Sequence, residues 1–248
     1  MLRKQIFTMV LLSLVTFCSC SSMGIIFPQG NDRSSFNAIV INERMTFGFL
    51  AEKIIIGEYK ADIDRSWTKE DSTHSFQFLG SSKTIRAEQN YSFKITGTDD
   101  FNWDGKCYAG AEVEKESIRL FKKKMTSHTV NKNNMACEFN SGDKKIFLYI
   151  EGPSNNKTGY IRFNEVNLDI IMKFESVPVG GGWTTSNNTI GYQIYNNGIL
   201  IAVIGTTLSD KALYVRKDIE QTLMPVLLNS AVALVAYKDM SSSIKNSQ

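Results

Sequence analysis

The clearest chemical motif in this chain is an alternating run of oxygen-bearing side chains, Asp100-Phe-Asn102-Trp-Asp104-Gly105. Its spacing matches the first half of a calcium loop, where alternate oxygens surround a hard cation and glycine allows a sharp turn. An EF-hand would place a glutamate at the twelfth position, but Ala111 stands there and the flanks favour strands. Two interpretations stay open: a different kind of Ca²⁺ site, and a polar hairpin turn at Asp104-Gly105. No other cofactor is expected.

Few residues are available for acid–base or zinc chemistry, because the chain has only two histidines, His74 and His128. A zinc site of the His and Cys type is therefore poorly supplied with ligands. His74 lies close in sequence to Asp71 and Ser75, which would suit a hydrolase. The sequence has no G-x-S-x-G elbow, P-loop or dinucleotide motif, so an enzyme is the least favoured class.

The N-terminal residues have the order of a bacterial secretion signal. Arg3 and Lys4 give a positive start, residues 6–17 are apolar, and the small residue Ser19 precedes Cys20. The pattern resembles a lipobox, whose cysteine is acylated and becomes the first residue of the mature protein. We therefore expect lipid attachment at Cys20, with a signal peptide at 1–19 and a tether at 20–35. Acylation of Cys18 and an ordinary secretory signal are the alternatives.

The expected location is the bacterial cell envelope. The apolar stretch at 6–17 is shorter than the ~20 residues of a membrane-spanning helix. Ser21, directly after the lipid attachment residue, is compatible with sorting to the outer membrane. Losing Arg3 and Lys4 lowers the basic count from 28 to 26 against 25 acidic residues, so the mature chain is near +1. This near-neutral charge argues against nucleic acid as a partner.

The remaining cysteines, Cys107 and Cys137, are expected to form a disulfide because the envelope is oxidising. In the chain-entropy model, such a bond would stabilise the fold by roughly 3–4 kcal/mol. A catalytic thiol is the alternative, although neither cysteine lies beside a histidine in the sequence.

Alternation of apolar and polar residues dominates the chain and positions these groups on strands. It is clear at 91–96, 166–174 and 190–195, and Asn196-Asn197-Gly198 predicts a hairpin turn. About a dozen such segments predict a single antiparallel β-barrel or β-sandwich spanning 36–240, followed by a polar tail at 241–248. Residues 223–237 are almost entirely apolar and favour a helix, which must be buried on every side.

This C-terminal order resembles the tubby, LURP-one and scramblase barrel superfamily. The resemblance covers Tyr192 to Asp239, where a hairpin, a strand ending at Tyr214 and an apolar helix follow one another. It implies a closed barrel of about twelve strands around a hydrophobic C-terminal helix. Tubby proteins bind phosphoinositides through paired basic residues. This chain offers no counterpart that can be placed, so no functional residue is carried over.

One loop is a candidate for partner contact. Gly180-Gly181-Gly182-Trp183 precedes a polar run, and Trp183 on the loop rim would either contact a sugar or protein, or plug the barrel end. These observations predict a lipid-anchored envelope protein that acts as a non-enzymatic binding or assembly module. Its partners would be the membrane, through the N-terminal lipid, and an envelope protein or a hydrophobic ligand. A carrier with a β-cavity and a Ca²⁺-dependent adhesin are the alternatives.

Overall fold

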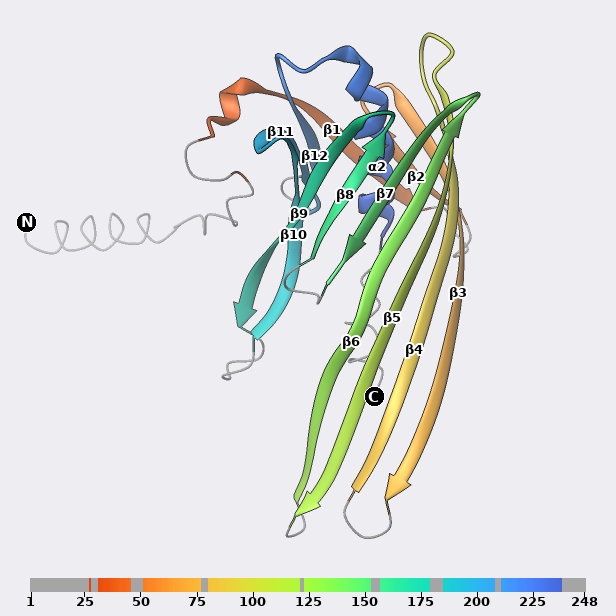
Figure 1. The fold of residues 1–248 in the computed structure, drawn as a ribbon, viewed down its shortest axis with the longest axis vertical. Coiled ribbons are helices and arrows are strands. Elements are labelled where there is room, and N and C mark those ends of the chain that lie inside the picture. The colour runs from red at the N-terminus through yellow and green to blue at the C-terminus, as the bar shows by residue number, and fades with distance from the viewer. Residues whose placement is uncertain are drawn as a thin grey trace, which may run out of the picture.

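Twelve antiparallel strands close into one barrel in the part of the chain that the structure describes (Figure 1). The structure is a computed structural model, and it describes residues 27, 31–45, 51–76, 80–120, 123–152, 157–178, 185–207 and 211–237. The prediction of a β-rich fold with a C-terminal helix is confirmed, and the barrel is the architecture found. The strands are β1 (Phe36–Met45), β2 (Ala51–Ile56), β3 (Tyr59–Phe76), β4 (Gly80–Thr96), β5 (Asn102–Leu120), β6 (Lys123–Ser141), β7 (Lys144–Glu151), β8 (Thr158–Phe163), β9 (Val166–Pro178), β10 (Thr185–Asn196), β11 (Ile199–Gly205) and β12 (Ala212–Arg216).

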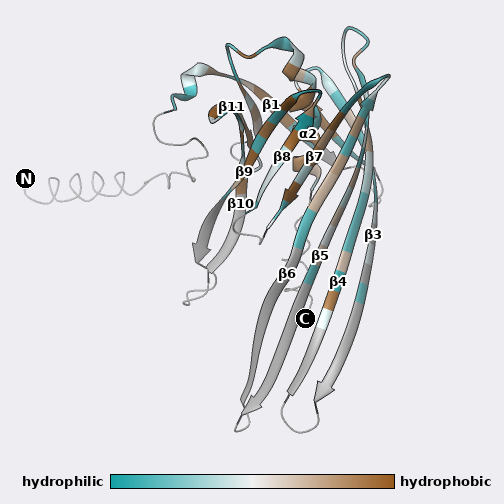
Figure 2. Cartoon of the chain, in the orientation of Figure 1, coloured by the Kyte–Doolittle hydropathy of each residue, from teal (hydrophilic) through white to brown (hydrophobic). Residues whose placement is uncertain are grey.

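Each strand pairs with the next one along the chain, and β12 pairs with β1 to close the barrel. Side chains alternate between the two faces, as the period of an extended chain requires. In β7, Ile146, Leu148 and Ile150 are buried inside, whereas Lys145 and Phe147 point outward. Figure 2 shows the hydrophobic residues gathered in the barrel body around the C-terminal helix.

The interior is filled by the helix α2 (Met224–Ala236), which follows the short helix η3 (Gln221–Leu223). Its residues from Val226 to Leu234 are all buried, so no side of the helix faces solvent. Pro225 lies in the first turn, where its missing N–H costs no helical hydrogen bond. The helix joins the inward side chains of the strands in one hydrophobic core. A helix with this pattern lies inside the barrel, as its apolar sequence requires.

Polar contacts hold the C-terminal end of α2 in place. Tyr91 Oη donates a hydrogen bond to the carbonyl of Ala233 at 2.8 Å. Beyond the helix, Tyr237 Oη donates to Asn133 Oδ1 at 2.6 Å, and Lys157 Nζ donates to the same oxygen at 2.8 Å. All four of these side chains are buried. The chain therefore leaves the helix through a hydrogen-bonded cluster rather than through purely apolar packing.

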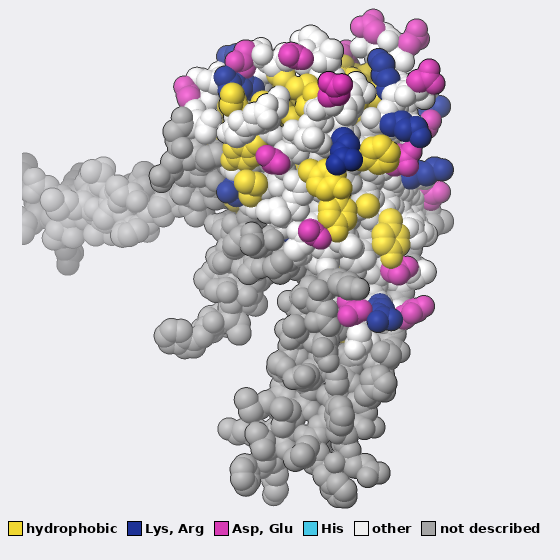
Figure 3. All heavy atoms as spheres, in the orientation of Figure 1, with side chains coloured by type: hydrophobic (Ala, Val, Ile, Leu, Met, Phe, Trp, Pro, Cys, Tyr) yellow, Lys and Arg dark blue, Asp and Glu magenta, His cyan; other side chains and the backbone are white. Residues whose placement is uncertain are grey.

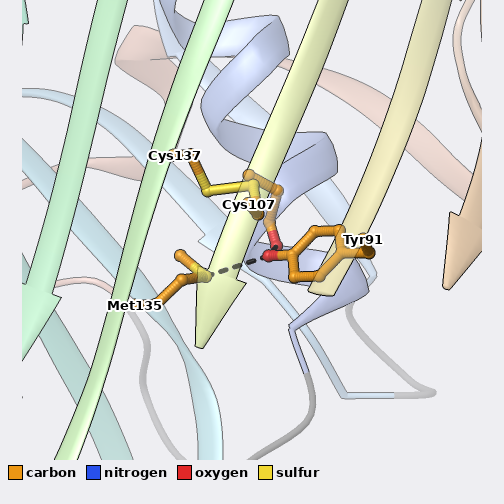
Figure 4. The surroundings of a disulfide bond; sticks show 5 residues. Tyr91, Cys107, Met135 and Cys137 are labelled. Carbon is orange, nitrogen blue, oxygen red and sulfur yellow. Dashed lines mark hydrogen bonds between the residues drawn. A yellow bond between two sulfur atoms is a disulfide. The ribbon is translucent and has the colours of Figure 1, made fainter. Parts of the chain in front are cut away.

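The predicted disulfide between Cys107 and Cys137 is present and joins β5 to β6. The two residues are directly paired in the antiparallel ladder, with their Cα atoms 4.1 Å apart. Figure 4 shows the bond beside Tyr91 and Met135, close to α2. Because the sulfur atoms are bonded to each other, the alternative of a catalytic thiol does not apply to this structure.

Strands β3 to β6 are much longer than the rest, with 17 to 19 residues each, against 5 to 13 in the other strands. Figure 1 shows their far ends continuing as a curved sheet below the barrel body. Among the described residues, no helix has the length and apolarity to cross a membrane.

A second hydrophobic cluster, joined by Phe27, lies on β1, β10, β11 and β12. Phe27 packs edge-on against Phe36 and Tyr214, with ring centroids 5.2 and 5.1 Å apart. The Arg33 guanidinium, in the short helix η2 (Arg33–Ser35), lies 4.6 Å from the Tyr214 ring centroid. This packing places Phe27, seven residues after Cys20, against one side of the barrel.

Candidate binding surface

The predicted turn at Asp104-Gly105 is wrong, because both residues lie within β5. The turn is formed earlier, where Asp99 and Asp100 adopt φ angles of 53° and 59°. Aspartate tolerates this left-handed conformation better than most residues. Gly105 serves packing instead, since a Cβ there would lie 2.4 Å from the Phe93 ring.

The three predicted calcium ligands do not converge on one point. Asp100 lies in the turn, whereas Asn102 and Asp104 are exposed, alternate residues of β5, roughly 7 Å apart along the strand. The described residues contain no group of three or more His, Cys, Asp or Glu side chains able to hold a metal ion. The calcium hypothesis therefore gains no support from the strand geometry.

The remaining predicted residues lie where the structure describes no side chain. Cys20 and Trp183 lie outside the described residues. His74 is in β3 and His128 in β6, with β4 and β5 between these strands, and their side chains are outside the description.

The outer surface of β5 to β8 carries four aromatic rings, three of them exposed and that of Tyr149 half-buried, which we call the tyrosine face: Tyr108, Phe147, Tyr149 and Tyr160. Strand register places Tyr108, Ala136, Tyr149 and Tyr160 in one row across four strands. Tyr108, Phe147 and Tyr160 are 44, 43 and 42 % exposed, among the most exposed large hydrophobic residues described. Figure 3 shows hydrophobic side chains among charged ones on the side that presents β6 to β8. An aromatic cluster of this kind marks a contact surface more often than scattered single residues do.

Neighbouring side chains orient these rings. The Tyr149 and Tyr160 rings lie 5.8 Å apart, and the Arg162 guanidinium lies 5.7 Å from the Tyr160 ring centroid. Tyr149 Oη donates to Glu151 Oε2 at 2.8 Å, and this bond raises the pKa of Tyr149. A hydrogen bond to Glu88 likewise raises the pKa of Tyr108. Both phenols are therefore neutral donors at pH 7, and each positions a carboxylate beside a ring.

A depression of about 380 Å³ opens on the same surface, centred on Gly110. Its walls are polar or aromatic side chains: Arg86, Glu88, Tyr108, Glu112 and Asn134. A Cβ at position 110 would meet Asn134 Oδ1 at 3.3 Å and the Tyr108 ring at 3.7 Å, so glycine keeps the floor open. Arg86 Nε donates to Glu112 Oε2 at 2.8 Å at the edge of the depression. This arrangement offers one aromatic wall and several hydrogen-bonding groups to a small guest.

Another depression, of about 290 Å³, lies on the outside of β3 to β5. It is lined by Asp64, Arg65, Ser66, Asn90, Tyr91, Ser92, Lys106 and Cys107. Its two aromatic or sulfur-bearing residues, Tyr91 and Cys107, are buried inside the barrel. It therefore lacks the exposed rings that distinguish the tyrosine face.

The sequence carries a local signal for part of this surface. Residues 146–150 are apolar or aromatic at every position, so strict alternation places Phe147 and Tyr149 on the opposite face from Ile146, Leu148 and Ile150. Joining Tyr108 and Tyr160 to them requires the register of four strands, which no local pattern provides.

Comparison with protein-family models, curated proteins and solved structures finds no match to this chain. The closed barrel around a C-terminal helix is the architecture that the resemblance to the tubby, LURP-one and scramblase superfamily implies.

Proposed function

We propose that this protein is a lipid-anchored envelope protein that acts as a non-enzymatic binding module through its tyrosine face. One observation carries the proposal: exposed aromatic rings lie in register on the outside of a barrel whose inside is filled by its own helix. Tyrosine and arginine are enriched among the residues that dominate binding energy at interfaces. Arg162, whose guanidinium lies beside the Tyr160 ring, adds an arginine to this surface.

The position of the surface relative to the N-terminus supports this role. Phe27 packs on β1 and β12, and in the strand order of the barrel β6 and β7 lie halfway round from these strands. A lipid on Cys20 would therefore attach the chain on one side and leave the tyrosine face on the other. Such an orientation suits contact with a partner away from the anchoring membrane.

The filled interior favours this function over the carrier of a hydrophobic ligand. Residues of α2 occupy the space that a ligand would need, and Val226, Leu227, Ala231 and Ala233 have no exposed surface. The Ca²⁺-dependent adhesin is the weaker alternative, since Asn102 and Asp104 lie on an extended strand.

The test measures retention of the full chain by envelope material after detergent dissolves the lipids. In the triple variant Tyr108→Ser/Phe147→Ser/Tyr160→Ser, only exposed rings change, so the barrel should fold. The unaltered protein should sediment with the remaining envelope, and the triple variant should be released at least about tenfold more.

The matched control is Val40→Ser/Ile199→Ser, which removes exposed apolar residues on β1 and β11 that are 60 and 53 % exposed. This control should be retained like the unaltered protein. Equal release of all three proteins would mean that the lipid is the only attachment, and equal retention would mean that another surface binds. Either result contradicts the proposal.

A further inference from the structure

We propose that the tyrosine face binds a linear, uncharged glycan, with one sugar ring in the Gly110 depression and the following rings on Tyr149 and Tyr160. This inference rests on the proposed function and names the class of its ligand. It is carried by the depression, by the spacing of the rings and by the charge balance of the surface.

The depression has the groups that recognise a pyranose ring. The Tyr108 ring forms one wall, and an aromatic face attracts the weakly positive C–H face of a sugar by the same electrostatics that attract a cation. Glu88 and Asn134 stand beside the ring as planar acceptors and, for the amide, donors. Sugar hydroxyls both donate and accept, so this set can pair with adjacent hydroxyls of one ring.

The row of tyrosines continues from the depression in the direction that a chain of sugars needs. Tyr108 and Tyr149 stand two strands apart, about 10 Å, and Tyr149 and Tyr160 stand one strand apart, about 5 Å. The rise per ring of an extended β-1,4-linked glycan is close to this strand spacing. A glycan lying across the strands would therefore meet an aromatic ring at intervals of one or two sugars, with Glu151 beside the second aromatic ring.

The charges of the surface select an uncharged partner. Arg86 is already paired with Glu112, and Glu88 and Glu151 accept from tyrosines. The carboxylates next to the rings would repel phosphate or carboxylate groups, whereas they can accept hydrogen bonds from neutral hydroxyls. An anionic polymer would meet the carboxylates of Glu88 and Glu151 beside Tyr108 and Tyr149, and only the Arg162 guanidinium beside Tyr160 offers it a positive charge among the described contacts of these rings.

The experiment titrates the full chain in detergent with the β-1,4-linked hexamer of N-acetylglucosamine and follows binding by calorimetry. Saturable binding is expected. Gly110→Ala should weaken the affinity at least about tenfold, because its Cβ enters the depression, yet leave the melting temperature near that of the unaltered protein. Tyr160→Ala should weaken it severalfold, whereas Tyr160→Phe should not, because stacking needs the ring and not its hydroxyl.

The controls separate this inference from the function on which it rests. Val40→Ser/Ile199→Ser should bind the hexamer like the unaltered protein. Absence of hexamer binding, or binding that Gly110→Ala does not change, overturns the glycan assignment. If envelope retention still depends on the tyrosine face and survives enzymatic digestion of the envelope glycan, the partner is a protein, so the proposed function stands and this inference fails.

Discussion

Tyr91 is the residue whose chemistry is most tightly coupled to the fold. It is buried, donates to Ala233 of α2 at 2.8 Å and lies 2.9 Å from Met135 Sδ (Figure 4). Burial raises the pKa of this phenol well above its usual range. The side chain therefore stays protonated in the folded protein at pH values where the unfolded chain ionises.

This shift predicts a loss of stability in alkaline solution. Below pH 10 both states hold the proton, so the stabilising effect is complete. As the pH rises above about 10, the unfolded state loses the proton first, and the unfolding free energy should fall by about 1.4 kcal/mol per pH unit. Urea unfolding from pH 8 to 11 measures the slope. Tyr91→Phe should be less stable at pH 8 by about 1 kcal/mol and have a shallower slope; equal slopes would contradict the assignment.

Gln89 is the second informative residue, because its amide is fully buried and neither of its polar atoms has a hydrogen-bond partner among the described residues. An unsatisfied buried polar group costs about 1–3 kcal/mol. Gln89→Leu should therefore raise the unfolding free energy by a similar amount in urea titrations. Gln193 is the matched control, since it is equally buried but accepts from Tyr195 Oη at 2.8 Å. Gln193→Leu should lower stability; a loss from Gln89→Leu as well would refute the argument.

Among the elements, α2 determines whether the barrel interior is filled or has a cavity that could hold a ligand. Leu227 has no exposed surface, so Leu227→Ala should leave a cavity and lower the unfolding free energy by about 2–5 kcal/mol. Met224→Ala, in the partly buried first turn, should cost clearly less. Thermal and urea unfolding of both variants provide the comparison. Equal small effects would mean that the helix is not enclosed.

The sequence predicts helices and strands well where the pattern of apolar side chains alone indicates which residues are buried. The apolar run at 223–237 indicates a buried helix, and the alternation in β4 and β9 indicates strands. The pairing of Cys107 with Cys137 follows from redox chemistry, and the structure confirms it. In each of these cases, the types of a few residues are enough to predict the helix, the strand or the disulfide.

Longer-range features escape such reasoning. The polar runs that extend β3 to β6 lack a clear alternation, so they resemble loops although the barrel pairs them as strands. Asp104-Gly105 has a hairpin composition, yet the space for the Phe93 ring requires Gly105 inside a strand, and the turn lies at Asp99 and Asp100 instead. The tyrosine face exists only once register aligns residues from β5, β7 and β8.

For the whole molecule, the proposed attachment to the membrane would depend on Cys20. Cys20→Ala should abolish incorporation of radiolabelled palmitate, because the acylated sulfur is removed. Cys18→Ala is the matched control and should retain the label. Labelling that persists in Cys20→Ala would move the lipid elsewhere in the chain.

Anchor and binding surface together define how the molecule would work. Phe27 holds the N-terminal segment on the side of β1 and β12, and the tyrosine face lies halfway round the barrel. The filled barrel between the two would set where the partner lies relative to the membrane, and this role does not require the barrel to open. The role proposed is therefore that of a spacer with a contact surface, in which the interior supplies stability.

Photo-crosslinking in living cells tests the central claim most directly. A photoreactive phenylalanine analogue replaces Tyr160 on β8 in one strain and Ile199, which is 53 % exposed on β11, three strands away, in another. Irradiation should give a discrete adduct of higher mass from position 160 and none from position 199. Adducts from 199 alone, equal adducts from both positions, or none from position 160 would contradict the assignment of the tyrosine face as the binding surface.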